Sequence, residues 1–226
     1  MPRFRTRDAH PEELLPVRRE LERRAGSALP DWERFAAGAQ LCSGAAGKEL
    51  PTYEHDSPGI HIITSGLLKA TVTMTTGRPR IVSFPRAGDI VAGLAFLSAA
   101  AAVPTLPDDG TEAPCHGDGK LTALVPTTAL RFDAAMTLEL AERHRAWSTL
   151  AIRLLAELIL LRTLRLNDHL ALTAEERYLK VLRDESPLVR RISQRDLALY
   201  LGVTPEALSR IASRSRDRRR LAVDAD

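Results

Sequence analysis

Residues 192–211, with the sequence ISQRDLALYLGVTPEALSRI, decide the fold of the C-terminal part of this chain. Ser193 and Asp196 have the spacing of a capping box, so a helix should begin here and end at the single glycine of the stretch. A second helix should open at Thr204, whose hydroxyl can cap it, with Pro205 in the first helical position. The stretch therefore predicts two short helices that meet across a tight glycine turn.

The apolar residues of these two helices fall on the faces that would pack together, and Ala198 is small enough to allow a close approach. This is the pattern of a helix-turn-helix, whose second helix enters the major groove of DNA. The opposite face of the second helix carries groups that hydrogen-bond base edges and phosphates. The alternative is an ordinary helical hairpin with a charged outer face. We predict that DNA is bound by Ser193, Gln194, Thr204, Pro205, Glu206, Ser209, Arg210, Ser213 and Arg214.

The charge of the chain is unevenly distributed. The net charge is only +3, but residues 186–220 contain nine arginines against three acidic residues. This segment therefore carries +6 and the remainder of the chain carries −3. Such an asymmetry is typical of a phosphate-binding end on an otherwise neutral protein. For residues 216–220 alone, a solvated charged face is an equally good interpretation.

Composition excludes several classes of protein. A chain of 226 residues with 44% hydrophobic content should form one large or two ordinary globular domains. Cys42 and Cys115 are too few for a disulfide scaffold, an iron–sulfur cluster or a zinc site, so we expect a cytoplasmic protein. They could form a redox pair, although buried thiols are the preferred interpretation. Apolar runs are too short to span a membrane, and no signal core follows the basic N-terminus.

Within the first 133 residues, the sequence pattern changes near residue 50 from short helical segments to β-rich runs. Residues 1–25 predict a loose tail and a short amphipathic helix, and residues 30–40 predict another short helix. Residues 98–120 lack a clear period and predict a long loop. Regularly spaced β-rich runs separated by turn residues favour a barrel or sandwich-like domain. These runs cover residues 61–63, 67–75, 80–84, 90–91, 121–125 and 129–132.

Residues 137–167 contain neither proline nor glycine and predict one long helix. Two apolar lines run along it, about 100° apart, so the helix needs two partners. We predict that these are its own β-domain and the same helix of a second subunit; the alternative is a helix buried within one subunit. The second line contains Ile152, Leu155, Ile159 and Leu166. The first has coiled-coil-like spacing and gives the predicted dimerisation residues, Trp147, Ala151, Leu154, Leu158 and Leu161.

The order of these elements resembles the Crp/Fnr family of bacterial transcription regulators. The resemblance covers most of the chain from about residue 50 and is firmest at residues 173–177, TAEER, and 192–211. Weaker similarities lie at residues 63–69, ITSGLLK, and 88–97, GDIVAGLAFL. The resemblance implies an α+β protein with three parts. These are an N-terminal β-roll like a cyclic-nucleotide-binding jelly roll (residues 1–136), a dimerisation helix (137–167) and a C-terminal winged helix-turn-helix (168–226).

The family also implies a function. Glu206, Ser209 and Arg210 match the Glu-x-x-Ser-Arg pattern of the Fnr-like branch, which reads palindromic sites, and a half-site similar to TTGA is expected. Pro205 departs from the family, whose corresponding residue is often a polar DNA contact. The implied protein is a homodimer that binds double-stranded DNA, with RNA polymerase as a candidate partner. Little sequence follows residues 218–223, RRRLAV, to form the wing.

The signal that controls such a regulator is less evident. Cyclic-nucleotide-binding relatives use a Glu and an Arg after the glycine-rich turn, whereas no Arg lies between Arg86 and Arg131 here. A buried phosphate without a cation is poorly stabilised, so we expect no tight binding of cyclic AMP or cyclic GMP, and no cofactor. The alternative is a regulator whose β-roll senses a cyclic nucleotide, haem or redox state. Haem candidates are His55, His61, His116 and Cys115.

A different class would be an enzyme that uses the β-domain to hold a small molecule or a metal. His55 and His61 are the imidazoles that lie close together in that region, and no His-x-His pattern with a following Glu accompanies them. Catalysis is therefore disfavoured, and we predict neither catalytic nor metal-binding residues.

Overall fold

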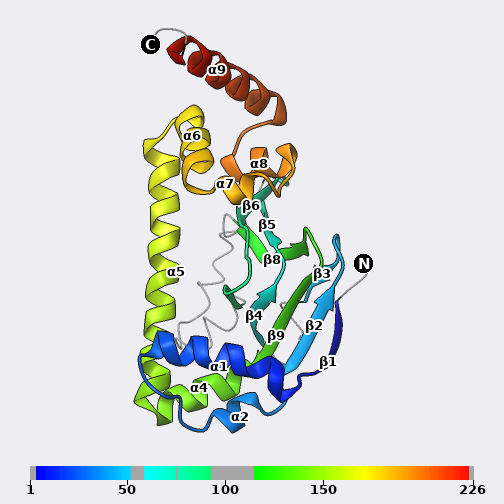
Figure 1. The fold of residues 1–226 in the computed structure, drawn as a ribbon, viewed down its shortest axis with the longest axis vertical. Helices are drawn as coiled ribbons and strands as arrows, with labels where there is room; N and C mark the ends of the chain where they lie inside the picture. Colours follow the sequence, from blue (N-terminus) through cyan, green and yellow to red (C-terminus); the bar gives the residue numbers. More distant parts are fainter. Residues whose placement is uncertain (1–3, 52–58, 75, 93–114, 224–226) are drawn as a thin grey trace. The chain divides into compact units, whose positions relative to one another are not determined.

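The computed structural model describes residues 4–51, 59–74, 76–92 and 115–223 (Figure 1). The chain divides into two compact units. The first contains Met1–Arg78 and Val82–Leu158, and the second contains Pro79–Ile81 and Ile159–Asp226. Among the described residues, no helix is both long enough and apolar enough to span a membrane.

The first unit is built around a roll of two antiparallel sheets, although residues 79–81 of one of its strands are assigned to the second unit. Its strands follow the predicted β-rich runs, and further strands extend both sheets. The five-stranded sheet has the order β1 (Arg5–Asp8), β2 (Gln40–Gly44), β9 (Thr127–Asp133), β4 (Gly59–Ser65) and β7 (Ile90–Ala92). The four-stranded sheet has the order β3 (Glu49–Leu50), β8 (Cys115–Ala123), β5 (Leu68–Met74) and β6 (Pro79–Ser83).

Both faces of the five-stranded sheet are covered. Residues that alternate along a strand point to opposite faces, and on β4 Ile63 packs into the core between the two sheets while Ile62 packs beneath helices. The covering elements are α1 (Pro11–Ala25), α2 (Trp32–Ala36), α4 (Ala134–Arg143) and the first turns of α5 (Arg145–Ala171). This double burial explains why β4 reads as a nearly continuous apolar run.

An aromatic cluster joins these helices to the sheet. The rings of Phe35 and Phe132 are stacked with centroids 4.4 Å apart, and those of Trp32 and Trp147 are stacked at 6.5 Å. The indole Nε1 of Trp147 donates a 2.8 Å hydrogen bond to the backbone oxygen of Pro30. The start of α5 is therefore fixed by contacts within the same chain.

The N-terminal region differs from the prediction. Residues 5–8, expected in a loose tail, form β1, which pairs antiparallel with β2. The helix predicted over residues 30–40 is limited to α2, because Gln40 already pairs with Arg131 in the sheet. The loop predicted over residues 98–120 lies partly outside the described residues, and its last six residues belong to β8.

The long helix is interrupted, whereas the sequence predicts one unbroken helix over residues 137–167. His144 has an extended backbone (φ −130°, ψ 121°) and separates α4 from α5. Its Nε2 lies 3.0 Å from an Asp31 carboxylate oxygen, and Ser148 Oγ donates to the backbone oxygen of Ala141 at 2.5 Å. These contacts compensate for the helical hydrogen bonds that are lost at the break.

The second unit contains α6 (Ala174–Asp184), α7 (Ser186–Val189), α8 (Gln194–Leu201) and α9 (Pro205–Val223). At the start of α6, Thr173 and Glu176 form the predicted capping box. Residues 159–223 carry no strand, so the predicted wing is absent from this part of the chain. The arginine-rich residues 216–220 continue α9 instead.

Candidate nucleic-acid interface

The first helix of the predicted pair begins and ends where the sequence indicates. Ser193 caps α8: its Oγ accepts a 3.0 Å hydrogen bond from the backbone N–H of Asp196 and donates to the Asp196 carboxylate at 2.8 Å. Gly202 ends the helix with φ of 77°, and its N–H donates to the backbone oxygen of Ala198. This left-handed conformation favours glycine because a side chain would clash there.

The second helix follows after three residues, 202–204. The Oγ1 of Thr204 accepts a 3.2 Å hydrogen bond from the backbone N–H of Ala207, and Pro205 opens α9. Between the helices, Ala198 and Leu208 are completely buried, and Leu197, Leu201 and Ile211 are nearly so. The predicted helix-turn-helix is thus present, and Ala198 is completely buried in it.

The outer face of α9 is polar and accessible. Leu208, Ile211 and Ser215 are buried, at the spacing of one helical face. All nine residues predicted to bind DNA are exposed: Ser193, Gln194, Thr204, Pro205, Glu206, Ser209, Arg210, Ser213 and Arg214. The structure therefore leaves all nine predicted side chains accessible to solvent.

The charges on this face suit base recognition. The pKa of Glu206 lies below its usual value. The main causes are hydrogen bonds to its carboxylate from the backbone N–H of Glu206 itself and from the side chain of Thr204, and the charge of Arg210 makes a smaller contribution. The carboxylate is therefore ionised and can accept a hydrogen bond from cytosine, while an exposed guanidinium can donate two to guanine. Beside these groups is a hollow of about 430 Å³ lined by Ala207, Arg210, Ile211, Ser213 and Arg214.

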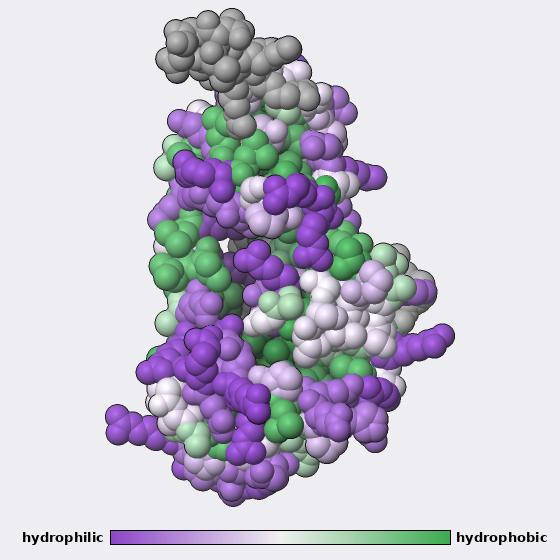
Figure 2. All heavy atoms as spheres, viewed as in Figure 1, coloured by the Kyte–Doolittle hydropathy of each residue, from purple (hydrophilic) through white to green (hydrophobic). Residues whose placement is uncertain are grey.

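The predicted dimerisation residues occupy different environments. Trp147 is buried in the core of the first unit, and Leu154 packs against the same core. Ala151 is half-buried, whereas Leu158 and Leu161 are exposed. Figure 2 shows apolar residues, in green, along the region that α5 occupies in Figure 1. In the second predicted apolar line of α5, the most exposed side chains are those of Ile152 and Ile159, which are 66% and 64% exposed.

The interior of the roll contains a buried histidine. His61 is 1% exposed, and neither ring nitrogen has a hydrogen-bond partner among the described residues. Burial, and to a lesser extent the charge of Arg131, lowers the pKa of His61 to about 4. Cys42 is also buried. His55, and the side chains of Cys115 and His116, lie outside the described residues.

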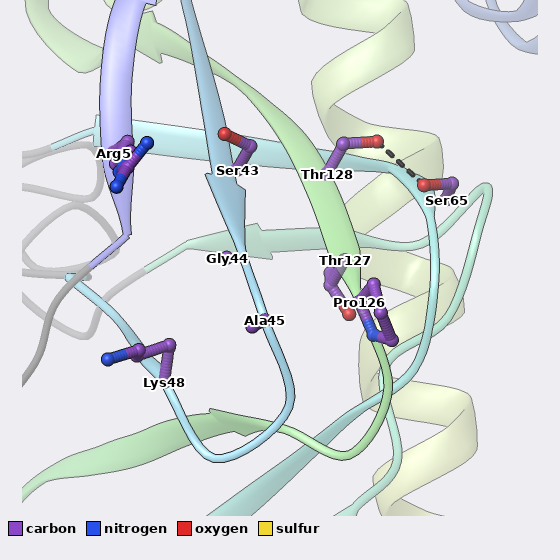
Figure 3. A pocket seen from close by; sticks show the side chains of 9 residues that line it. All are labelled: Arg5, Ser43, Gly44, Ala45, Lys48, Ser65, Pro126, Thr127 and Thr128. Carbon is purple, nitrogen blue, oxygen red and sulfur yellow. Dashed lines mark hydrogen bonds between the residues drawn. The ribbon is translucent and has the colours of Figure 1, made fainter.

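A second hollow lies at one end of the five-stranded sheet and is drawn in Figure 3. Its volume is about 450 Å³, and Arg5, Ser43, Thr128 and Ser65 line it in one row across four adjacent strands. The hydroxyls of Ser65 and Thr128 lie 2.7 Å apart, and Lys48 adds a second cation. These groups could hold an anion. The sequence does not predict this hollow, because strand register alone brings its residues together.

Searches for sequence relatives find no protein-family model and no curated protein that matches. Solved structures do match. A protein from Eubacterium rectale, assigned to the Crp/Fnr family of transcriptional regulators, is similar over 82% of both chains, with a TM-score of 0.63 and 14% identity. The regulator CLP of Xanthomonas campestris has a TM-score of 0.60 and 14% identity, over 83% of this chain and 91% of its own.

FixK2 of Bradyrhizobium japonicum is similar over 80% of this chain and 85% of its own, with a TM-score of 0.54 and 20% identity. In the present structure, a strand roll is followed by a long helix and then by a helix-turn-helix. Because the identities are low, the likeness concerns the fold. The chain therefore has the fold of the Crp/Fnr transcription regulators.

Proposed function

We propose that this chain is a sequence-specific regulator of transcription that binds a palindromic promoter site as a homodimer. The observation that carries the proposal is the outer face of α9, where Glu206, Ser209 and Arg210 are exposed. The opposite face of α9 packs against α8, to which a turn at Gly202 connects it. A helix presented in this way fits the major groove, and these side chains can distinguish base pairs.

The proposed homodimer is supported by α5, through the second predicted apolar line in place of the first, because Trp147 and Leu154 of the first line pack within their own chain. Ile152, Leu155, Ile159, Leu166 and Leu170 recur at helical spacing, and each is at least 40% exposed. A contiguous exposed apolar line on a helix indicates a protein interface. A second copy of α5 would bury this line and place two recognition helices about a two-fold axis, which suits a palindrome.

The rest of the proposal assigns roles to the parts. Residues 1–136 act as the sensor-like roll, residues 137–167 mediate dimerisation and residues 168–226 bind DNA. The protein acts in the cytoplasm, with RNA polymerase as its further partner, and it is not an enzyme. Addition of the protein to purified RNA polymerase on a promoter that carries the palindrome tests the polymerase contact, with the transcript as the readout.

A second candidate function is sensing within the roll. His61 favours it, because a buried imidazole without a hydrogen-bond partner is unfavourable and a ligand would satisfy it. An absorbance spectrum of the purified protein tests haem. Calorimetric titration tests cyclic AMP and cyclic GMP, for which we expect no micromolar binding.

Selection of bound sequences from random duplex DNA tests the leading proposal. The wild-type protein should recover a palindrome, and Glu206→Ala and Arg210→Ala should each lose the preference at particular base pairs. Arg145→Ala is the matched control, because Arg145 is an exposed arginine on α5 outside the recognition face. Recovery of no common sequence by the wild type would refute the proposal.

A further inference from the structure

The second unit contains a cation–π contact between α5 and the helix-turn-helix. The guanidinium carbon of Arg165, on α5, lies 3.6 Å from the centroid of the Tyr200 ring, on α8. Nη2 of the same guanidinium donates a 2.6 Å hydrogen bond to the backbone oxygen of Tyr200. Arg165 therefore contacts both the side chain and the main chain of one residue in the first helix of the DNA-binding pair.

Tyr200 is also held at the far end of its ring. Its hydroxyl donates a 3.2 Å hydrogen bond to Glu185, the residue that follows α6, and only 9% of Tyr200 is exposed. A change of the side-chain rotamer of Tyr200 would lose both the guanidinium and the carboxylate. These three residues, the Arg165–Tyr200–Glu185 chain, connect α5, α8 and the end of α6.

Further contacts fix the short link between α5 and α6, which is residues 172–173. Lys180, on α6, donates to both carboxylate oxygens of Asp168, on α5, at 2.6 and 2.7 Å. Arg177, also on α6, donates to the backbone oxygen of Leu201 at the end of α8, at 3.2 and 3.3 Å. Lys180 thus fixes α6 to α5, and Arg177 fixes α6 to the end of α8. The direction of α8 therefore follows that of the last turns of α5.

The direction of α9 follows that of α8, since their packed residues are fully buried. In a dimer formed along α5, the angle between α5 and α9 sets the distance between the two recognition helices. That distance must match half-sites about one turn of DNA apart, roughly 34 Å. An arginine suits this connection, because its planar guanidinium stacks on a ring and donates hydrogen bonds at the same time.

We propose that Arg165 is a positioning residue that sets the half-site spacing this protein accepts, by fixing α8 to α5 through Tyr200. The proposal rests on the proposed function and adds a residue that acts on DNA recognition from outside the recognition face. Spacing thus depends on the contact of Arg165 with the ring and backbone of Tyr200, and base identity depends on α9.

The test measures dissociation constants for palindromes whose spacers differ by single base pairs, and for a duplex with one half-site. Arg165→Met removes the cation, and Tyr200→Phe keeps the ring but loses the bond to Glu185. Arg162→Met is the matched control, because Arg162 is an exposed arginine on the same helix, with no hydrogen bond or ion pair among the described residues.

Arg165→Met should bind the best palindrome about tenfold more weakly, should prefer no single spacer, and should keep its affinity for the half-site. Tyr200→Phe and Arg162→Met should retain the wild-type preference. An Arg165→Met protein with the wild-type spacer preference would overturn the proposal. Equal losses for palindromes and half-site would also overturn it, because they indicate general damage to the DNA-binding unit.

Hydrogen exchange of the α8 amides, measured without DNA, separates this proposal from the proposed function. A wild-type protein that binds no palindrome contradicts the proposed function alone. Faster exchange over residues 194–201 in Arg165→Met, with unchanged exchange in Arg162→Met, supports the attachment of α8 to α5, and equal exchange in both overturns it. If Arg165→Met does not fold, Arg165→Lys, which keeps the charge but lacks the planar fork, should show the same changes in both assays.

Discussion

His61 on β4 lies directly opposite Arg131 on β9, inside the roll, and its imidazole has no hydrogen-bond partner among the described residues. Burial is the main reason that the pKa of His61 falls from 6.5 to about 4, and the charge of Arg131 adds to it. Arg131 itself donates a 3.3 Å hydrogen bond to Gln40. Because the folded-state pKa lies below that of the unfolded chain, the unfolded chain binds the proton more tightly.

The free energy of unfolding should therefore fall by about 3 kcal/mol as the pH is lowered from about 6.5 to about 4. Below pH 4, His61 should cause no further loss of stability. Urea titrations at several pH values measure this slope. His61→Leu should flatten it, since leucine does not titrate. Ile62→Val, at the adjacent buried position, should lower stability equally at every pH. A slope that survives in His61→Leu would contradict this prediction.

The cap of α6 should stabilise the second unit. Thr173 Oγ1 accepts from the backbone N–H of Glu176, whose carboxylate accepts from the backbone N–H of Thr173 at 2.7 Å. Thr173→Ala leaves one of these groups without a partner and should lower the free energy of unfolding by about 1 kcal/mol. Thr173→Ser keeps the hydroxyl and should stay close to wild type in denaturant unfolding. Similar losses in both variants would argue against the cap.

The proposed dimer should depend on the exposed apolar line of α5. Ile159→Glu should convert the dimer to a folded monomer, because the side chain is 64% exposed in one subunit and the charge would be buried twice in a symmetric interface. Leu15→Glu, at a 52% exposed leucine on α1, is the control and should remain dimeric. Sedimentation equilibrium distinguishes the two states. Persistence of the dimer in Ile159→Glu would place the interface elsewhere.

The helix-turn-helix could be predicted because its signals are local. A cap such as Thr204, a left-handed position such as Gly202 and the spacing of Leu208 and Ile211 depend on residues within a few positions of each other. The polar face of α9 follows from the same period. These are the parts of the candidate site where sequence and structure agree most closely.

Elements that depend on distant residues could not be predicted. The sequence of β1, RTRD, has no alternation and is exposed, and the strand forms because β2 offers an antiparallel partner. The break at His144 follows a contact with Asp31, more than one hundred residues away. Arg165, between leucines, has the pattern of a solvated charge on a helix, and its stacking on Tyr200 depends on how α5 and α8 pack.

The central claim is that α9 reads base edges, and a double-mutant cycle between Arg210 and guanine N7 tests it most directly. Each guanine of the selected palindrome is replaced in turn by 7-deazaguanine, which lacks the N7 acceptor, and dissociation constants are measured for wild type and Arg210→Ala. One symmetric pair of replacements should weaken wild-type binding by about 1–3 kcal/mol and leave Arg210→Ala unaffected. Losses that simply add at every guanine would contradict the claim.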